Sequence, residues 1–182
     1  MRTITALPRT AVTILAGSML VGCEREPVGV ENVDAPRPAL AAVKVAASGA
    51  FAQSAITSLD VQSAGGNTII TQTSDGSISG TLSGPFHDDL KVVIHPNGKF
   101  NAHFTITCTC TVGGKSGVLE FVASDTGELL SPTLAAFAGR AVIKGGTGDL
   151  SGLHGVLQIE GTVDVTTGLS TYGYSGTLHW QP

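Results

Sequence analysis

A stretch of fourteen residues near the middle of the chain alternates without interruption between apolar and polar side chains. It covers residues 99–112, KFNAHFTITCTCTV. The apolar positions are Phe100, Ala102, Phe104, Ile106, Cys108, Cys110 and Val112. Successive side chains of a β-strand point to opposite faces, whereas the 3.6-residue period of a helix would mix the two sets. The stretch therefore predicts a strand with one buried face. A straight strand of this length would exceed ~40 Å, so we expect it to curl, bulge or break.

The same period-two pattern recurs from residue 48 to the end of the chain. It predicts strand segments at 48–58, 67–74, 77–83, 89–95, 99–112, 116–124, 136–145, 154–165 and 171–180. Glycine-containing pairs predict turns at Asp75-Gly76, Asn97-Gly98, Gly113-Gly114 and Thr167-Gly168. Ser131-Pro132 is expected to open a loop or short helix that runs through Ala138.

No amphipathic helix is predicted that could cover the apolar face of this sheet. The sheet must therefore fold onto itself as a barrel or a sandwich. A barrel also removes the exposed edges that a free sheet would present. We predict an all-β fold over residues 48–182, a single closed antiparallel barrel of about eight strands.

Composition excludes several classes of protein. Charged residues make up only 13% of the chain, too few for a coiled coil, and the formal net charge is −4. Without a cluster of Lys and Arg, we expect no nucleic-acid partner. The run Gly145-Gly146-Thr147-Gly148 lacks the Gly-Lys-Ser/Thr ending of a phosphate-binding loop. We expect no cofactor and no metal site.

The first 22 residues are typical of a signal peptide. Arg2 and Arg9 precede an apolar stretch at residues 11–21 that is too short to span a bilayer. Leu20-Val21-Gly22-Cys23 resembles the lipobox of bacterial lipoproteins. The resemblance implies cleavage between Gly22 and Cys23 and acylation of the Cys23 thiol. An ordinary signal peptide with a chance cysteine, or a short uncleaved anchor, are the alternatives.

These features predict three parts: a signal peptide over 1–22, a lipidated cysteine and disordered tether over 23–47, and the barrel. Residues 24–47 are rich in proline and charge and lack apolar periodicity, as expected of a tether. The expected location is the periplasmic or outer cell-surface side of a bacterial membrane, to which the acyl chains anchor the protein.

Several glycine-rich segments resemble a known family. They are Asp75-Gly76-Ser77-Ile78-Ser79-Gly80-Thr81, His95-Pro96-Asn97-Gly98, residues 112–117 (VGGKSG) and residues 145–155 (GGTGDLSGLHG). Their order and spacing are similar to those of the bacterial DUF3224 family. The resemblance implies an eight-stranded barrel like that of plant allene oxide cyclase, also comparable to a lipocalin cup. Family members often carry a Gln-His pair where this chain has Val122 and Ala123, so a polar site at that point is not expected.

Cys108 and Cys110 lie on the apolar face of the same predicted strand. Residues i and i+2 of a strand sit roughly 6.6 Å apart, near the upper limit for a disulfide. Three interpretations stay open: a disulfide that needs a local pucker, two buried thiols acting as small core residues, or a ligand or redox site.

The inward positions also define a hypothetical ligand pocket. Its expected lining is Phe104, Ile106, Cys108, Cys110, Leu119, Phe121, Ile159, Tyr172, Tyr174 and Trp180. Glu120 and Glu160 fall on the outer face, and the polar run His87-Asp88-Asp89 is interpreted as a loop or edge protection.

Three functions remain compatible with the sequence. The first is a non-enzymatic envelope barrel that binds a small apolar ligand, which a cavity of about 300 Å³ or more would support. The second is a cyclase or isomerase of an apolar substrate, like allene oxide cyclase. The third is a structural or protein-interaction module. Nothing in the sequence identifies catalytic residues, and it favours a protein that is not an enzyme.

Overall fold

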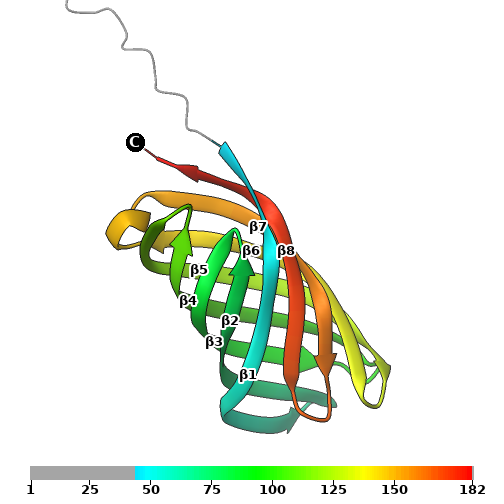
Figure 1. Ribbon diagram of the computed structural model, residues 1–182. Helices are drawn as coiled ribbons and strands as arrows, with labels where there is room; N and C mark the ends of the chain where they lie inside the picture. The colour runs from blue at the N-terminus through cyan, green and yellow to red at the C-terminus, as the bar shows by residue number, and fades with distance from the viewer. Residues whose placement is uncertain (1–43, 182) are drawn as a thin grey trace, which may run out of the picture. The chain divides into compact units, whose positions relative to one another are not determined.

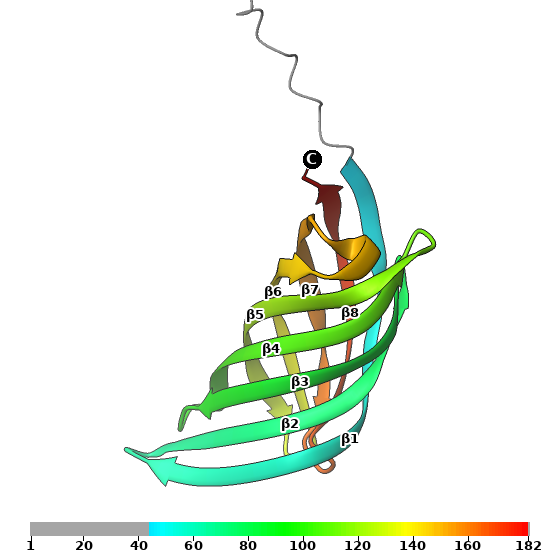
Figure 2. The same ribbon diagram turned by 90° about the vertical axis from the view of Figure 1, so that its left-hand side faces the viewer.

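The computed structural model describes residues 44–181, which form one closed sheet of eight antiparallel strands (Figures 1 and 2). The predicted signal peptide, Cys23 and most of the predicted tether lie outside the described residues. The strands are β1 (Lys44–Ala64), β2 (Asn67–Gly80), β3 (Leu82–Ile94), β4 (Lys99–Val112), β5 (Lys115–Ser131), β6 (Leu134–Gly146), β7 (Leu153–Asp164) and β8 (Leu169–Trp180). Each strand pairs with the next, and β8 pairs with β1. The predicted barrel is confirmed, and β1 starts four residues before the expected boundary at Ser48.

Strand β4 shows the alternation that its sequence predicts. Its burial alternates at every position from Lys99 to Val112, with Cys108 and Ile106 fully buried. Its ladder with β5 is unbroken from Lys99↔Glu128 to Val112↔Lys115. The strand therefore curves as a whole around the barrel rather than breaking or bulging along this ladder.

Two of the sequence predictions about turns are wrong. Asp75-Gly76 is not a turn, because β2 continues through it to Gly80, where φ is 105°. The chain reverses at Thr81 instead, so the predicted segments 67–74 and 77–83 belong largely to one long strand. Residues 131–138 contain no helix, since only Pro132 and Thr133 separate β5 from β6. The predicted turns at Asn97-Gly98, Gly113-Gly114 and Thr167-Gly168 are confirmed.

The one helix among the described residues is a short 3₁₀ turn, η1 (Gly148–Leu150), which covers the end of the barrel between β6 and β7. Its Leu150 is fully buried. At the same end, the Tyr174 hydroxyl accepts a hydrogen bond from the Leu82 amide at 2.8 Å. This end of the barrel is therefore closed by packed side chains. Within residues 44–181 no helix is long and apolar enough to cross a membrane.

An aromatic cluster centred on Phe51 fills the middle of the barrel. The ring of Phe51 stacks on that of Tyr172, with centroids 4.8 Å apart, and meets Phe86, Phe121 and Tyr174 edge-on. Phe51 is fully buried. Edge-to-face and stacked pairs add to the stabilisation from burial, so this cluster is a major part of the core.

Cys108 and Cys110 form a disulfide across one intervening residue. Their Cα atoms are 5.3 Å apart, within the usual range for a bridge and shorter than the ideal strand spacing. Local contraction of the strand thus brings the two sulfurs together without a register shift in the β4–β5 ladder. Of the three interpretations, the structure supports the disulfide.

We expect Phe51→Ala to lower the free energy of unfolding by about 4 kcal/mol, because it leaves a cavity among four aromatic rings. Leu59→Ala, at a position 55% exposed on the same strand, should change it by less than about 0.5 kcal/mol. Urea denaturation followed by circular dichroism measures both. Equal effects of the two substitutions would contradict the described core.

Candidate ligand-binding site

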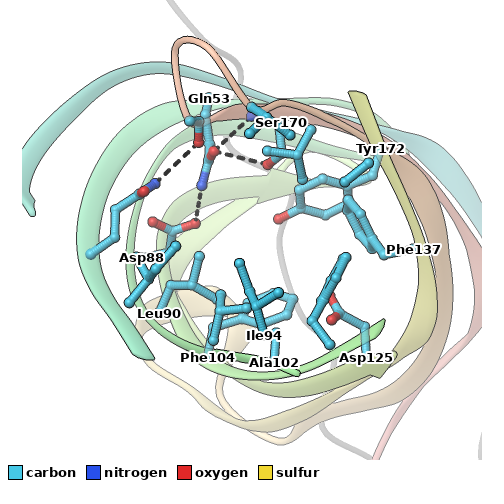
Figure 3. Close-up of a pocket in the computed structure, with 18 of the residues that line it drawn as sticks. Gln53, Asp88, Leu90, Ile94, Ala102, Phe104, Asp125, Phe137, Ser170 and Tyr172 are labelled. Carbon is cyan, nitrogen blue, oxygen red and sulfur yellow. Dashed lines mark hydrogen bonds between the residues drawn. The ribbon is translucent and has the colours of Figure 1, made fainter. Parts of the chain in front are cut away.

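A cavity of about 140 Å³ opens at the end of the barrel opposite η1. This end carries the β1–β2, β3–β4, β5–β6 and β7–β8 turns. Most of the lining is apolar and comes from all eight strands and the β7–β8 turn (Figure 3). The apolar lining residues are Ile70, Leu90, Val92, Ile94, Phe100, Ala102, Phe104, Leu129, Ala135, Phe137, Val163 and Val165. This volume does not reach the value of about 300 Å³ that the sequence analysis set as support for a ligand-binding function, so only a small molecule or part of a larger one could enter.

One side of the cavity lies where β1 separates from β8. The ladder between these strands ends at Ala52↔Thr171. Beyond it, β1 has register shifts against β2 after Gln53 and after Ile56. Such irregularities bend a strand, and the rest of β1 continues with β2 as a hairpin that projects from the barrel (Figure 2). The lower part of the β1–β8 seam is therefore open to the interior.

The Gln53 side chain bridges this seam where the backbone ladder stops. Its Oε1 accepts hydrogen bonds from the amide and the hydroxyl of Ser170, each at 2.8 Å. Its Nε2 donates to Asp88 Oδ2 at 2.8 Å. A neighbouring side chain, Gln72, donates to the Gly168 carbonyl at 3.4 Å. Side-chain amides thus take over the role of backbone pairing at the upper wall of the cavity (Figure 3).

Asp88 is inside the barrel rather than in a loop, which corrects the sequence interpretation of His87-Asp88-Asp89. Asp88 is 1% exposed, and the second oxygen of its carboxyl group, Oδ1, accepts a hydrogen bond from the Ser74 hydroxyl. Burial raises the pKa of Asp88, while the hydrogen bonds from Ser74 and Gln53 oppose that rise. Because both oxygens have partners, Asp88 is a structural member of the network.

Asp125 has a different environment. It lies on β5 and faces the cavity, where its Oδ1 atom is buried and has no hydrogen-bond partner among residues 44–181. Burial raises the pKa of Asp125 from 3.8 to about 7. On the adjacent strand β6, Gly139 lies opposite Asp125, and a Cβ atom there would overlap the Ser124 carbonyl oxygen and the Cα and Cβ atoms of Asp125. The fold therefore places the Asp125 side chain in the cavity and leaves its Oδ1 atom without a hydrogen-bond partner among residues 44–181.

Tyr172 presents a second unsatisfied group to the same cavity. Its hydroxyl oxygen is buried and likewise without a hydrogen-bond partner in the described chain. Burial raises its pKa well above the usual value, and the charges of Asp88 and Asp125 contribute to the rise. In Figure 3 the hydroxyl points toward the centre of the cavity. Two buried polar groups without partners in one cavity mark a site where a ligand can supply the missing hydrogen bonds.

Of the ten predicted pocket residues, Phe104 and Tyr172 line the cavity. Seven of the others pack the closed part of the core, namely Ile106, Cys108, Cys110, Leu119, Phe121, Ile159 and Tyr174. The last, Trp180, is half-buried beside Lys115, whose ammonium lies 4.8 Å from the indole centroid. The alternation along each strand thus identified which side chains point inward. It did not identify the level along the barrel at which the cavity lies. Glu120 and Glu160 are exposed, as expected.

Sequence reasoning missed Asp88, Asp125, Gln53, Gln72 and Ser170. A signal was present for two of them. Asp125 is the next inward position after Leu119, Phe121 and Ala123, which are spaced two residues apart. It lies one position beyond the predicted end of that strand. Asp88 likewise continues the phase of Leu90 and Val92 in β3. A charged residue at a position expected to point into the barrel was therefore the overlooked sign of a polar group in the interior.

A second hollow, of about 580 Å³, follows the outer side of the β3–β4 turn and includes His95, Asn97 and Lys99. It is shallow and lined by polar and apolar surface in equal parts, and no buried atom without a hydrogen-bond partner lies along it. Within residues 44–181, no group of three or more His, Cys, Asp or Glu side chains could hold a metal ion. The cavity at the barrel end is thus the stronger candidate site.

We expect Asp125→Asn to stabilise the protein at alkaline pH. Because the folded pKa lies above the unfolded value of 3.8, Asp125 lowers stability as pH rises from about 4 to about 7. The substitution should raise the free energy of unfolding by about 2 to 4 kcal/mol at about pH 8 and change it little near pH 4. Urea titrations at both pH values measure this. Equal stability of the two proteins at pH 8 would contradict the burial of an unpaired carboxyl group.

Comparisons with known proteins identify the fold. No family model and no curated protein matches the sequence. Among solved structures, a DUF3224-family protein of unknown function from Shewanella oneidensis MR-1 matches with a TM-score of 0.53 and 17% identity, covering 78% of this chain and 98% of that one. Two pterocarpan synthase dirigent proteins also match. PsPTS1 has a TM-score of 0.47, 15% identity and coverage of 77% and 97%, and GePTS1 has 0.45, 13%, 78% and 90%. The predicted resemblance is confirmed at the level of fold: residues 44–181 adopt the barrel of a DUF3224-family protein.

Proposed function

We propose that this protein is a lipid-anchored envelope barrel that binds a small apolar ligand carrying one hydrogen-bonding group. A single observation carries the proposal. An apolar cavity contains two buried polar atoms, Asp125 Oδ1 and the Tyr172 hydroxyl, that lack partners in the described chain. Leaving such groups unpaired costs about 1–3 kcal/mol each, and a bound ligand would recover that cost.

The cavity limits the size of the bound group. An engineered protein cavity of ~150 Å³ holds a benzene molecule, and this one has about 140 Å³. The bound part is therefore about as large as one aromatic ring. Any longer substituent would extend through the mouth.

The rim of the mouth suits an apolar molecule. Leu129, Leu130 and Leu134 on the β5–β6 hairpin are exposed, as is Val165, whose amide bonds to the Thr133 carbonyl beside them. Exposed apolar patches of this kind often border ligand grooves or interaction sites. An entering ligand would exchange water for these side chains before it reaches Asp125.

The anchoring part of the proposal rests on the sequence. The apolar stretch at 11–21 and the Leu20-Val21-Gly22-Cys23 match favour export and acylation of Cys23. The disulfide between Cys108 and Cys110 agrees with an oxidising compartment. A ligand-binding protein of this kind would act at the cell envelope.

An isomerase or cyclase is a second candidate function. The observation in its favour is Asp125, whose pKa of about 7 would let it give and take a proton near neutral pH. Catalysis would require Asp125→Asn to abolish conversion of a bound substrate while binding persists. Binding without conversion favours the first candidate.

We expect a cavity-filling substitution to remove ligand binding. Ala102→Leu places a larger side chain in the cavity, because Ala102 is 3% exposed and belongs to its lining. Ala138→Leu, on the outer face of β6, is the matched control. Ligand-observed NMR with a set of single-ring compounds should show binding to wild type and to Ala138→Leu, and at least tenfold weaker binding to Ala102→Leu. Unchanged binding to Ala102→Leu would place the site elsewhere.

The anchor has its own test. In a bacterial host, the wild-type chain should incorporate radiolabelled palmitate and fractionate with membranes, whereas Cys23→Ser should do neither. Cys110→Ser, which leaves Cys23 intact, serves as the control. Labelling of Cys23→Ser would contradict acylation at that residue.

A further inference from the structure

The cavity carries charge of only one sign. Asp88 and Asp125 are its acidic residues, and its lining includes no Lys, Arg or His. The basic side chains near this level of the surrounding strands, Lys91 on β3, His103 on β4 and Arg140 on β6, are exposed and alternate with inward residues, so they face outward. The interior therefore has a negative potential whenever either carboxyl group is ionised.

Asp125 lacks the compensation that Asp88 has. Asp88 receives hydrogen bonds from Gln53 and Ser74, whereas Asp125 Oδ1 receives none from residues 44–181. An ionised carboxylate in an apolar cavity is costly unless an opposite charge or several hydrogen bonds accompany it. The group that would compensate Asp125 most fully is a cation, since it supplies both.

The aromatic lining favours the same kind of ligand. Phe100, Phe104, Phe137 and Tyr172 all line the cavity. Aromatic faces attract ammonium groups, and they also accept an apolar ring. The ammonium group could also donate a hydrogen bond to the Tyr172 hydroxyl oxygen, which has no partner among the described residues.

Building on the ligand-binding function proposed above, we propose that the cavity selects a small organic amine in its protonated form. The ammonium group donates a hydrogen bond to Asp125, and an apolar group about the size of one aromatic ring fills the remaining space. A carboxylate ligand of the same size is disfavoured, because it would bring a third negative group beside Asp88 and Asp125.

This geometry sets the pH dependence of binding. The other titratable groups that line the cavity with Asp125 are Asp88 from β3 and Tyr172 from β8. The strands paired on either side of β5 contribute Ala102 and Phe104 from β4 and Phe137 from β6, and β7 contributes Val163, none of which titrates. Because the pKa of Asp125 is about 7, an amine must displace a proton from it in acidic solution. Amine affinity should therefore fall about tenfold between about pH 8 and pH 6.

Three compounds of nearly the same shape test the inference: benzylamine, benzyl alcohol and benzoate. Their dissociation constants for the purified protein are measured by ligand-observed NMR at pH 8 and pH 6. We expect benzylamine to bind at least about tenfold more tightly than benzyl alcohol at pH 8, and benzoate more weakly than either. Asp125→Asn should remove the preference for the amine, so that the dissociation constants of benzylamine and benzyl alcohol become equal within about twofold. Asp89→Asn, an exposed neighbour of Asp88, should change neither.

The outcomes separate this inference from the function on which it rests. Benzyl alcohol binding as tightly as benzylamine, or benzoate binding best, would overturn the selection of a cation and leave a ligand-binding cavity. Binding of none of the three would overturn both. If Asp125→Asn does not fold, the wild-type pH dependence decides, because an amine affinity equal at pH 6 and pH 8 contradicts a role for Asp125.

Discussion

The structure depends on the closure of one amphipathic sheet upon itself. With one face apolar and no helix among residues 44–181 to cover it, the sheet buries that face only by pairing β1 with β8. This ladder spans Lys44 to Ala52 on β1 and stops there, although β1 continues to Ala64. The incomplete seam divides the barrel into a closed half, packed around Phe51, and an open half that contains the cavity. The pairing of β1 with β8 therefore closes the barrel, and the early end of that pairing leaves the cavity.

The two halves are stabilised in different ways. In the closed half, aromatic and aliphatic side chains exclude water, and the Tyr174 hydroxyl bonds to backbone groups near the β2–β3 turn. In the open half, Gln53 replaces the missing backbone pairing and holds Asp88 in place. Asp125 is outside this network, and it keeps an unpaired carboxyl oxygen in apolar surroundings. Polar groups with hydrogen-bond partners and polar groups without them thus lie within one cavity.

Much of the fold could be predicted from local pattern. The alternation of β4 specified its buried face residue by residue, and three of the four predicted glycine turns are confirmed, whereas the turn at Gly65-Gly66 was not predicted. Asp75-Gly76 misled the prediction because β2 pairs on both sides there, and tertiary pairing overrides a local turn preference. The cavity could not be predicted, because the alternation along a strand shows which side chains point inward but not where the interior is hollow. That depends on where β1 leaves β8, which happens after Ala52. Asp88 and Asp125 were missed because the strands were predicted too short to include them.

The most direct test of this account is the ionisation of Asp125 in the ligand-free protein. Carbon-detected NMR of the side-chain carboxyl group, followed as a function of pH, measures its pKa. The account predicts a value of about 7, because burial in an apolar cavity disfavours the charged form. A midpoint near the ordinary value of 3.8 would mean that water or a polar partner reaches the group, and would contradict the burial of an unpaired carboxyl group.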